Sequence, residues 1–399
     1  MDQKIVDEVA DTLLSGWITT GPKTKRFEKE ITAYMGAKTT ICFNSATAGL
    51  ELVLRWYGIG PGDEVIIPAY TYCATANVVM HCGAKPVMVD CLPNGFNLDP
   101  VKVAEAITAQ TKVIIPVDVA GLPCKYDDLW EVIRDPKNVA MFTPNGQFQE
   151  QLGRIMLFAD AAHSFGAKYR GRQMGIVADG AAFSFHAVKN LTTAEGGAVC
   201  LNLPEGFDHD EAYRMLNIMS LHGQSKDALA KTQKGAWKYD VLMPGYKCNM
   251  TDIQAAIGLV ELARYDSETL PRRREICERY DDLLEPFEWA DRPAFLRPWG
   301  TESSYHLYQL RIDGASEDQR DAIIQAVAEM DVALNVHFIP LPLLTAYRGL
   351  GYDMAQFPEA QARFANEISL PLFYNLSNDQ VAEVVRALAA AVSQVMSHA

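Results

Sequence analysis

Two segments of this sequence place reactive side chains directly after apolar runs. Residues 157–163 read LFADAAH and hold Asp160 and His163. Residues 182–197 read AFSFHAVKNLTTAEGG and hold Ser184 and Lys189 ahead of a Gly-Gly turn. Each apolar run has the composition of a buried strand, and ligands in open α/β sheets bind beyond the carboxyl ends of the strands. We therefore expect both segments to face one pocket.

A lysine and a carboxylate in one pocket are the groups that pyridoxal 5′-phosphate requires. The cofactor needs an amine for a Schiff base, an acid that keeps the pyridine nitrogen protonated, and an anion site for its phosphate. Lys189 would supply the amine and Asp160 the acid. For these two residues alone, an ion pair between loops is the alternative interpretation.

A third segment could supply the phosphate site. Residues 43–50 read FNSATAGL, follow the first expected strand and open a helix of small residues. The N–H groups at a helix start carry partial positive charge and bind phosphate without Lys or Arg. We expect Ala46 and Thr47 to contribute backbone N–H groups, with the Thr47 hydroxyl as a further donor. Alternatively, Ser45 is only the N-cap of this helix.

These segments must be positioned by a regular framework, and the first 200 residues show one. Short β-branched runs alternate with stretches of helical period, which predicts a mostly parallel sheet covered on both faces. The expected strands are residues 39–43, 64–67, 86–90, 112–117, 155–159, 181–185 and 198–201, and the expected helices are 48–57, 71–82, 100–108 and 126–133. Residues 135–153 interrupt this rhythm with Pro, Asn, Gln and Gly, which indicates a surface excursion.

The last third of the chain has a different pattern. Helix starts of the capping-box type occur at Thr251 with Gln254, and again at 316–319 and 377–380. We predict a large cofactor-binding domain at residues 1–255 and a smaller α+β domain at 256–399.

Composition excludes several classes of protein. The 399 residues are 49% hydrophobic and 22% charged, which excludes a disordered chain, and the net charge of -14 argues against a nucleic-acid partner. The eight scattered cysteines have no paired metal spacing, so we expect reduced thiols and no metal site. No signal peptide and no membrane span is predicted, because no apolar stretch has the required length. These features favour a cytoplasmic enzyme.

The string from Ser184 to Gly197 resembles the Schiff-base segment of the DegT family of sugar aminotransferases, S-F-H-x-x-K-N-x-x-x-x-E-G-G. Further family-like segments occur in family order along nearly the whole chain, at residues 17–22, 44–50, 160–163, 245–258, 303–308, 335–340 and 369–373. The resemblance implies the type I fold of pyridoxal phosphate enzymes, with a mixed, mostly parallel seven-stranded sheet. It also implies transfer of the amino group of L-glutamate to a nucleotide-linked keto sugar, most similar to the branch that acts at C4 of UDP-linked sugars and makes 4-amino-4-deoxy-arabinose, within polysaccharide or lipopolysaccharide biosynthesis.

The resemblance also assigns roles to individual residues. Lys189 would bind the cofactor and shuttle the proton, and Asp160 would pair with the pyridine nitrogen. His163 would lie beside the 3-oxygen, and Tyr72 would stack on the ring. Ser184 and Thr47 would hold the phosphate.

A polar side chain of the neighbouring subunit completes the phosphate site in the family, which implies a homodimer with shared active sites. Here Lys247 and Asn249 replace the Asn and Arg of many relatives; we favour Asn249. Asp118 stands where relatives usually have His, which affects local packing. His337 is the histidine that we place near the sugar.

Other reactions on this scaffold remain open at this stage. A sugar dehydratase is one, although relatives of that kind carry histidine in place of the lysine. A cyclitol ketone as acceptor, amination at C3, and a regulatory relative without turnover are the others. The sequence also leaves open whether basic residues such as Lys23, Lys25 and Arg26 assist a pyrophosphate or form a solvated helix face.

Overall fold

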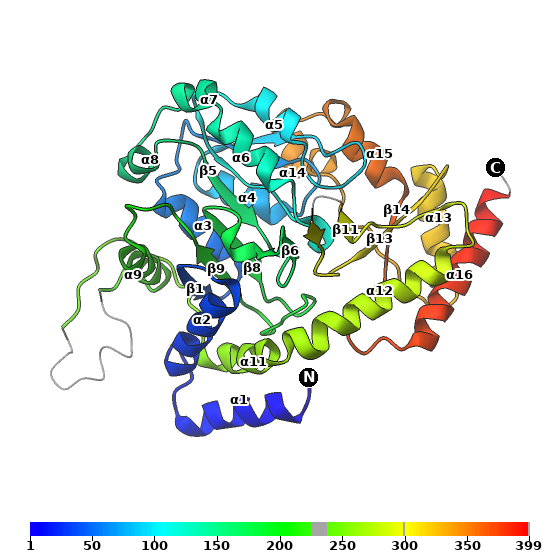
Figure 1. Ribbon diagram of the computed structural model, residues 1–399, viewed down its shortest axis with the longest axis horizontal. Helices are drawn as coiled ribbons and strands as arrows, with labels where there is room; N and C mark the ends of the chain where they lie inside the picture. Colours follow the sequence, from blue (N-terminus) through cyan, green and yellow to red (C-terminus); the bar gives the residue numbers. More distant parts are fainter. Residues whose placement is uncertain (226–237, 298–299, 398–399) are drawn as a thin grey trace.

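A seven-stranded sheet forms the centre of the larger lobe of the molecule (Figure 1). The computed structural model describes residues 1–225, 238–297 and 300–397. Strands β1 and β8 pair antiparallel with β9, and the other neighbours are parallel, so the predicted mixed and mostly parallel sheet is confirmed. In spatial order the strands are β1 (Thr39–Phe43), β9 (Gly197–Leu201), β8 (Gly180–Ser184), β5 (Met156–Asp160), β4 (Thr111–Ile114), β2 (Glu64–Pro68) and β3 (Lys85–Val89).

Successive residues of these strands enter two different hydrophobic cores. In β5, Met156 and Phe158 belong to one core, whereas Leu157 and Ala159 belong to the other. This alternation follows from the two-residue period of a strand, and it explains why the strand sequences are almost continuously apolar. Both faces of the sheet are therefore buried.

Helices cover each face. One core receives side chains from α3 (Ala46–Trp56), α4 (Cys73–His81) and α9 (His209–Ser220). The other receives side chains from α2 (Pro22–Met35), α5 (Pro100–Ala106), α6 (Tyr126–Arg134) and α11 (Asp252–Ala263), and α1 (Gln3–Ser15) packs on α11. The predicted strands and helices are thus present, with ends displaced by one to three residues.

The segment 135–153 is mostly exposed, as predicted for a surface excursion. It contains two short helices that the sequence did not predict, α7 (Pro136–Met141) and α8 (Gln147–Leu152). Phe148 stacks on Trp56 with ring centroids 4.5 Å apart, and the buried Gln149 donates to the carbonyl of Tyr57. These contacts tie the segment to the end of α3.

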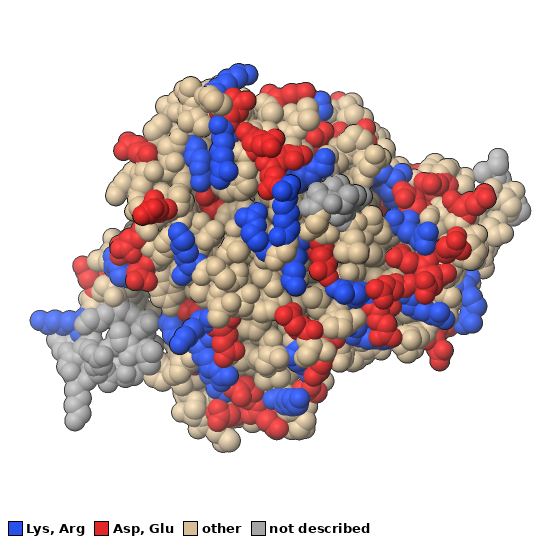
Figure 2. Space-filling view, viewed as in Figure 1, with Lys and Arg blue, Asp and Glu red and all other residues tan. Residues whose placement is uncertain are grey.

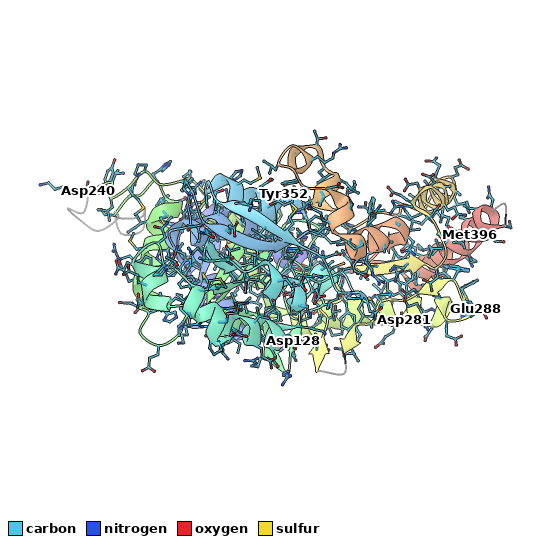
Figure 3. All side chains as sticks on the ribbon, turned by 90° about the horizontal axis from the view of Figure 1, so that it is seen from above. Asp128, Asp240, Asp281, Glu288, Tyr352 and Met396 are labelled. Carbon is cyan, nitrogen blue, oxygen red and sulfur yellow. The ribbon has the colours of Figure 1, made fainter. Side chains whose placement is uncertain are left out.

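A second lobe contains a three-stranded sheet, β10 (Ala290–Asp291), β13 (Tyr308–Ile312) and β14 (Glu367–Leu370). Its separate core lies between this sheet and α12 (Leu270–Leu284), α13 (Glu317–Ala328) and α16 (Asn378–Met396). All three predicted capping boxes are present, at α11, α13 and α16. In Figure 3, Met396 of this lobe lies at the opposite end of the molecule from Asp240. The domain boundary at residues 255/256 stays a prediction, since α11 crosses it.

Short elements join the two lobes. A four-stranded sheet pairs β6 (Lys168–Tyr169) and β7 (Arg172–Gln173) with β11 (Leu296–Arg297) and β12 (Thr301–Glu302). Helices α14 (Thr345–Arg348) and α15 (Pro358–Asn366) contribute Tyr347 and Phe364 to a core of the large sheet. Among the helices of the described residues, none combines the length and hydropathy that a membrane span requires.

Candidate active site

The two reactive segments meet at one edge of the sheet, as predicted. Asp160 is the last residue of β5 and Ser184 the last residue of β8. The two strands are parallel neighbours, with Asp160 opposite Ala182. Lys189 follows in the loop after β8, where its backbone N–H donates to the carbonyl of His186 at 2.9 Å. The carboxylate and the amine thus approach one pocket from adjacent strands.

Asp160 is buried but retains hydrogen-bonding capacity. Thr75 Oγ1 donates to its carboxylate at 2.8 Å, and the Ala162 N–H donates at 3.3 Å. Burial raises the pKa of Asp160, while these two donors and the charge of Lys189 oppose that rise. A carboxylate accepts about four hydrogen bonds, so this one can also accept a proton-bearing ring nitrogen.

Lys189 lies in an environment that weakens its hold on a proton. Burial lowers the pKa of its amine to about 8, and the charge of Asp160 only partly offsets this. A substantial fraction of the amine is therefore neutral near pH 8, whereas an exposed lysine is almost fully charged there. A neutral amine is the form that attacks a carbonyl carbon.

The rings of His163, Phe338 and Tyr72 lie close together, and His163 is near Lys189. His163 is buried, accepts from the Ala120 N–H at Nδ1 (3.3 Å), and stacks with Phe338 at a centroid distance of 5.7 Å. Burial and the nearby Lys189 charge hold the pKa of His163 well below its usual range, so its ring is neutral. Tyr72, the residue before α4, is 60% exposed and lies 5.9 Å from Phe338. Tyr72 therefore presents an accessible ring, as a stacking partner must.

The start of α3 lies where the sequence predicts a cradle for an anion. Ser45 is the N-cap and accepts from the Ala48 N–H at 3.1 Å. Ala46 and Thr47 occupy the first turn, where helix N–H groups lack partners within the helix. A Cβ on Gly197 would lie 2.3 Å from the Ala46 nitrogen, so glycine is needed where β9 passes this turn. The cradle, Asp160 and Lys189 together fit pyridoxal phosphate.

Residues 247–249, which we expect to reach a neighbouring subunit, lie beside the end of β1, just before α3. Asn249 forms an isolated bridge with Phe43, and its Nδ2 donates to Thr20 Oγ1 at 2.6 Å. Lys247 Nζ donates to Asn249 Oδ1. Both side chains are thus held within the subunit, and which of them completes a phosphate site stays a prediction.

Sequence reasoning missed several residues that shape this site. Thr75, near the start of α4, orients Asp160 through a hydrogen bond. Ser369 was inside a family-like segment but had no assigned role. Its Oγ donates to Glu367 at 2.5 Å and lies 3.0 Å from His337 Nδ1. His337 is close enough to Lys189 that burial together with this charge lowers its pKa to about 4.

Basic residues near the N-terminus form ion pairs. Lys23 contacts Glu8 at 2.8 Å, and Lys25 contacts Glu28 at 3.3 Å. Arg26 pairs with Glu30 on the exposed face of α2, which matches the solvated-face interpretation. Basic and acidic side chains are interspersed over the face shown in Figure 2. Within the described ranges, no cluster of three or more His, Cys, Asp or Glu could hold a metal.

Comparison with known proteins places the chain in a family. The DegT/DnrJ/EryC1/StrS aminotransferase family matches residues 1–143 and 149–389. The spore coat polysaccharide biosynthesis protein SpsC of Bacillus subtilis is 38% identical over 96% of this chain and 93% of its own. A solved structure of "Putative sugar aminotransferase Spr1654" from Streptococcus pneumoniae, in its PMP form, has a TM-score of 0.95 and 48% identity, covering 99% of this chain and 98% of its own.

Two further structures extend this result. The PLP form of Spr1654 matches with a TM-score of 0.94 and 46% identity, over 99% of this chain and 97% of its own. Helicobacter pylori PseC, an aminotransferase of pseudoaminic acid biosynthesis, has a TM-score of 0.86 over 99% of this chain and 97% of its own; at 24% identity it supports the fold alone. The predicted type I fold and cofactor are confirmed. The chain belongs to the DegT/DnrJ/EryC1/StrS aminotransferase family and is a pyridoxal phosphate-dependent aminotransferase.

Proposed function

We propose that this enzyme transfers the amino group of L-glutamate to the keto carbon, C4, of a nucleotide-linked sugar. The observation that carries the proposal is the placement of Asp160 at the end of β5 and of Lys189 in the loop that follows the adjacent parallel strand β8. The similarity to SpsC and Spr1654, whose names refer to polysaccharide biosynthesis and sugar amination, supports a sugar as the acceptor.

The side chains have distinct tasks in this proposal. Pyridoxal phosphate, when bound, supplies a carbonyl carbon that accepts the amino group and a conjugated ring that accepts electrons. Asp160 holds the proton on the ring nitrogen, and the buried, neutral His163 packs beside the ring without adding a charge. Lys189 gives and takes the proton at the substrate carbon, a task for which a pKa of about 8 suits it.

The start of α3 and the end of β8 hold the cofactor in position. Ala46 and Thr47 donate to the phosphate from the first turn, and Ser184 adds its hydroxyl. These contacts carry no net positive side-chain charge. The helix end and its hydrogen bonds therefore supply the attraction for the phosphate.

We further propose a cytoplasmic homodimer with shared active sites. Exposed apolar side chains support a partner surface: Val241 and Leu242, close to Lys247 and Asn249 in the chain, are each about half exposed. The eight cysteines are all free, which suits a reducing compartment. Lys247 or Asn249 of one subunit would then reach the phosphate site of the other.

The decisive experiment uses the loss and return of cofactor absorbance. Protein loaded with pyridoxal phosphate is expected to absorb in the visible and to lose this band with L-glutamate. The resulting pyridoxamine form is then offered UDP- and TDP-linked 4-keto and 3-keto sugars and cyclitol ketones. Return of the band with a 4-keto sugar, and an amino sugar as product, would support the proposal. Return only with a 3-keto sugar or a cyclitol, or a deoxy product without an amine, would contradict it.

A further inference from the structure

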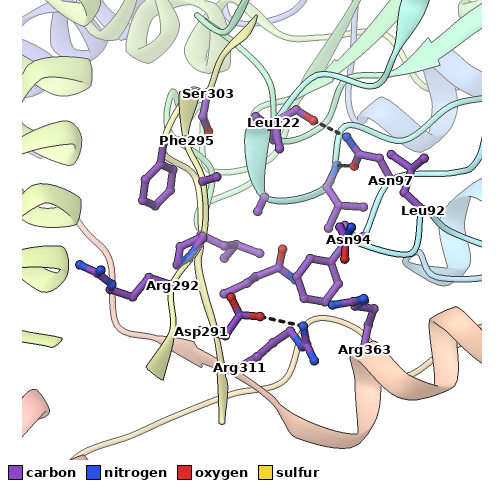
Figure 4. A pocket seen from close by; sticks show the side chains of 18 of the residues that line it. Leu92, Asn94, Asn97, Leu122, Asp291, Arg292, Phe295, Ser303, Arg311 and Arg363 are labelled. Carbon is purple, nitrogen blue, oxygen red and sulfur yellow. Dashed lines mark hydrogen bonds and ion pairs between the residues drawn. The ribbon is translucent and has the colours of Figure 1, made fainter. Parts of the chain in front are cut away.

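A cavity of about 600 Å³ lies between the two lobes, outside the cluster around Lys189 (Figure 4). One wall is residues 92–97 and 119–125 of the large lobe, after β3 and β4. The other comprises residues 291–295 and parts of 303–311 in the smaller lobe, with Arg363 of α15. Pockets of this volume between lobes commonly bind small molecules.

The charges that line this cavity are unbalanced. Its titratable side chains are four bases and one acid, and the acid, Asp291, already pairs with Arg311 at 2.7 Å. Figure 4 shows Arg311 and Arg363 reaching toward the same space from different elements. The remaining two bases are Lys125, 3.8 Å from Asp128, and Arg292, which donates to the carbonyl of Asp281. The cavity is therefore electropositive although the whole chain carries a net charge of -14.

Arg363 has the weakest compensation of these bases. Its side chain is 11% exposed, and its one acidic neighbour among the described ion pairs is Glu359, at 3.9 Å on the same helix. Its Nε is buried and has no hydrogen-bond partner within the described part of the chain. Burial, then repulsion by Arg311, lowers the pKa of Arg363. A buried donor without an acceptor is costly, and an anion here would satisfy it.

The rest of the lining is largely apolar. Phe96 contributes a ring, and Leu92, Pro93 and Leu307 contribute aliphatic surface. Asn94, at the rim, is exposed. A ligand that fits both parts would carry an anionic group for the two arginines and an apolar ring for this surface.

The cavity also adjoins the active-site wall. The segment η1 (Val119–Gly121) lines it, and the Ala120 N–H in this segment donates to His163. On the other side, Gln309 lines the cavity and donates to the carbonyl of His337. A ligand that contacts both walls would thus touch Ala120 and Gln309, which are hydrogen-bonded to two histidines of the active site.

We propose that this cavity binds a small organic anion, a phosphate monoester or carboxylate attached to an apolar ring, at a site separate from the cofactor and substrate pocket. Arg363 and Arg311 hold the anionic group, and Phe96 with the neighbouring aliphatic side chains holds the ring. Since the walls belong to different lobes, the bound anion fixes their spacing. This site does not depend on the identity of the sugar substrate.

Titration calorimetry on the pyridoxal phosphate-loaded protein tests this site. The loaded form is used because its cofactor phosphate site is filled. Phenyl phosphate is the first probe, benzoate separates carboxylate from phosphate preference, and phenol is the uncharged control. We expect phenyl phosphate or benzoate to bind and phenol not to bind. Arg363→Gln and Arg311→Gln should each weaken binding about tenfold or more, because each removes a charge-assisted hydrogen bond.

Arg214→Gln is the control, since Arg214 is an exposed residue of α9 that pairs with Glu211 and does not line the cavity. It should leave affinity unchanged. Asn94→Trp, at the exposed rim, should block binding without lowering the melting temperature. If an arginine variant does not fold, this variant tests whether the ligand binds in the cavity. Absence of binding to the unaltered protein, or equal affinity in the Arg363, Arg311 and Asn94 variants, would overturn the proposal.

Discussion

Two buried aspartates lie at the carboxyl ends of neighbouring strands, Asp118 after β4 and Asp160 as the last residue of β5, but have different tasks. Burial raises the pKa of both, for Asp118 to about 6. Three donors of the chain satisfy Asp118: the Tyr126 hydroxyl at 3.0 Å, Ser164 Oγ at 2.7 Å and the Cys124 N–H at 2.9 Å. Among the described residues, two donors reach Asp160, Thr75 and Ala162. The difference teaches that spare acceptor capacity, and not burial or a raised pKa, distinguishes the carboxylate available for chemistry.

The contacts of Asp118 also explain its place in the fold. It joins the start of α6, through Tyr126, to Ser164, the residue after His163. It therefore holds the loop that carries His163. This agrees with the expectation that the departure from histidine at this position affects packing and not the core chemistry.

The largest effect should come from replacing Lys189, the amine near Asp160. Lys189→Ala should lower transamination by roughly 10³-fold or more, because both covalent attachment and proton transfer are lost. Steady-state rates and the visible absorbance of the loaded protein measure this. Lys102→Ala, at an exposed ion pair on α5, is the control and should keep full activity. Comparable activity in the two variants would refute the assignment of Lys189.

The next effect tests the charge of Asp160 itself. Asp160→Asn keeps an oxygen for the Thr75 hydroxyl but loses the charge that holds a ring proton. We expect the catalytic rate to fall by about 10²-fold or more, with little change in melting temperature. Thr75→Ala should give a smaller loss, because it removes only an orienting hydrogen bond. An Asp160→Asn enzyme with nearly full activity would remove the distinction between the two aspartates.

The anion cradle should respond to a single methyl group. Gly197→Ala places a Cβ 2.3 Å from the Ala46 nitrogen, so the first turn of α3 must move. Equilibrium dialysis should show that affinity for pyridoxal phosphate falls about tenfold or more. Gly60→Ala, where a Cβ meets no atom within 4 Å, is the control. Unchanged affinity in the Gly197 variant would mean that the phosphate binds elsewhere.

The smallest catalytic effect is expected at Asp118, whose carboxylate already accepts hydrogen bonds from three donors. Asp118→Asn should lower the free energy of unfolding by about 1–3 kcal/mol, because an amide cannot accept from all three donors. Activity per folded molecule should stay within about twofold. Denaturant unfolding and active-site titration measure the two quantities, and a large rate loss in the fully folded variant would give Asp118 a catalytic task.

The same variant has a defined pH dependence. The pKa of Asp118 is raised in the folded protein, so the native state binds its proton more tightly than the unfolded chain does. The stability from this group is full below pH 4 and is lost as the pH rises through about 6. The stability difference between the unaltered protein and Asp118→Asn should therefore be larger at pH 5 than at pH 7. A difference that grows toward pH 7 would contradict this sign.

The sequence alone determined the local pattern of this protein. Short β-branched runs placed the strands, and paired Ser or Thr and Gln residues placed three helix starts. The run around Lys189 indicated the family and the cofactor. These signals are local, because each depends on residues a few positions apart.

Only the tertiary structure decided which polar groups meet. Thr75 reaches Asp160 across 85 positions, and Ser164 reaches Asp118 across 46. Arg363 lines a cavity with residues 92–97 because the two lobes meet there. The order of α7 and α8 depends likewise on distant contacts, such as that of Phe148 with Trp56. Burial and partner geometry arise only after the chain folds, so spacing could propose Asp160 but could not show that it keeps more free acceptor sites than Asp118 does.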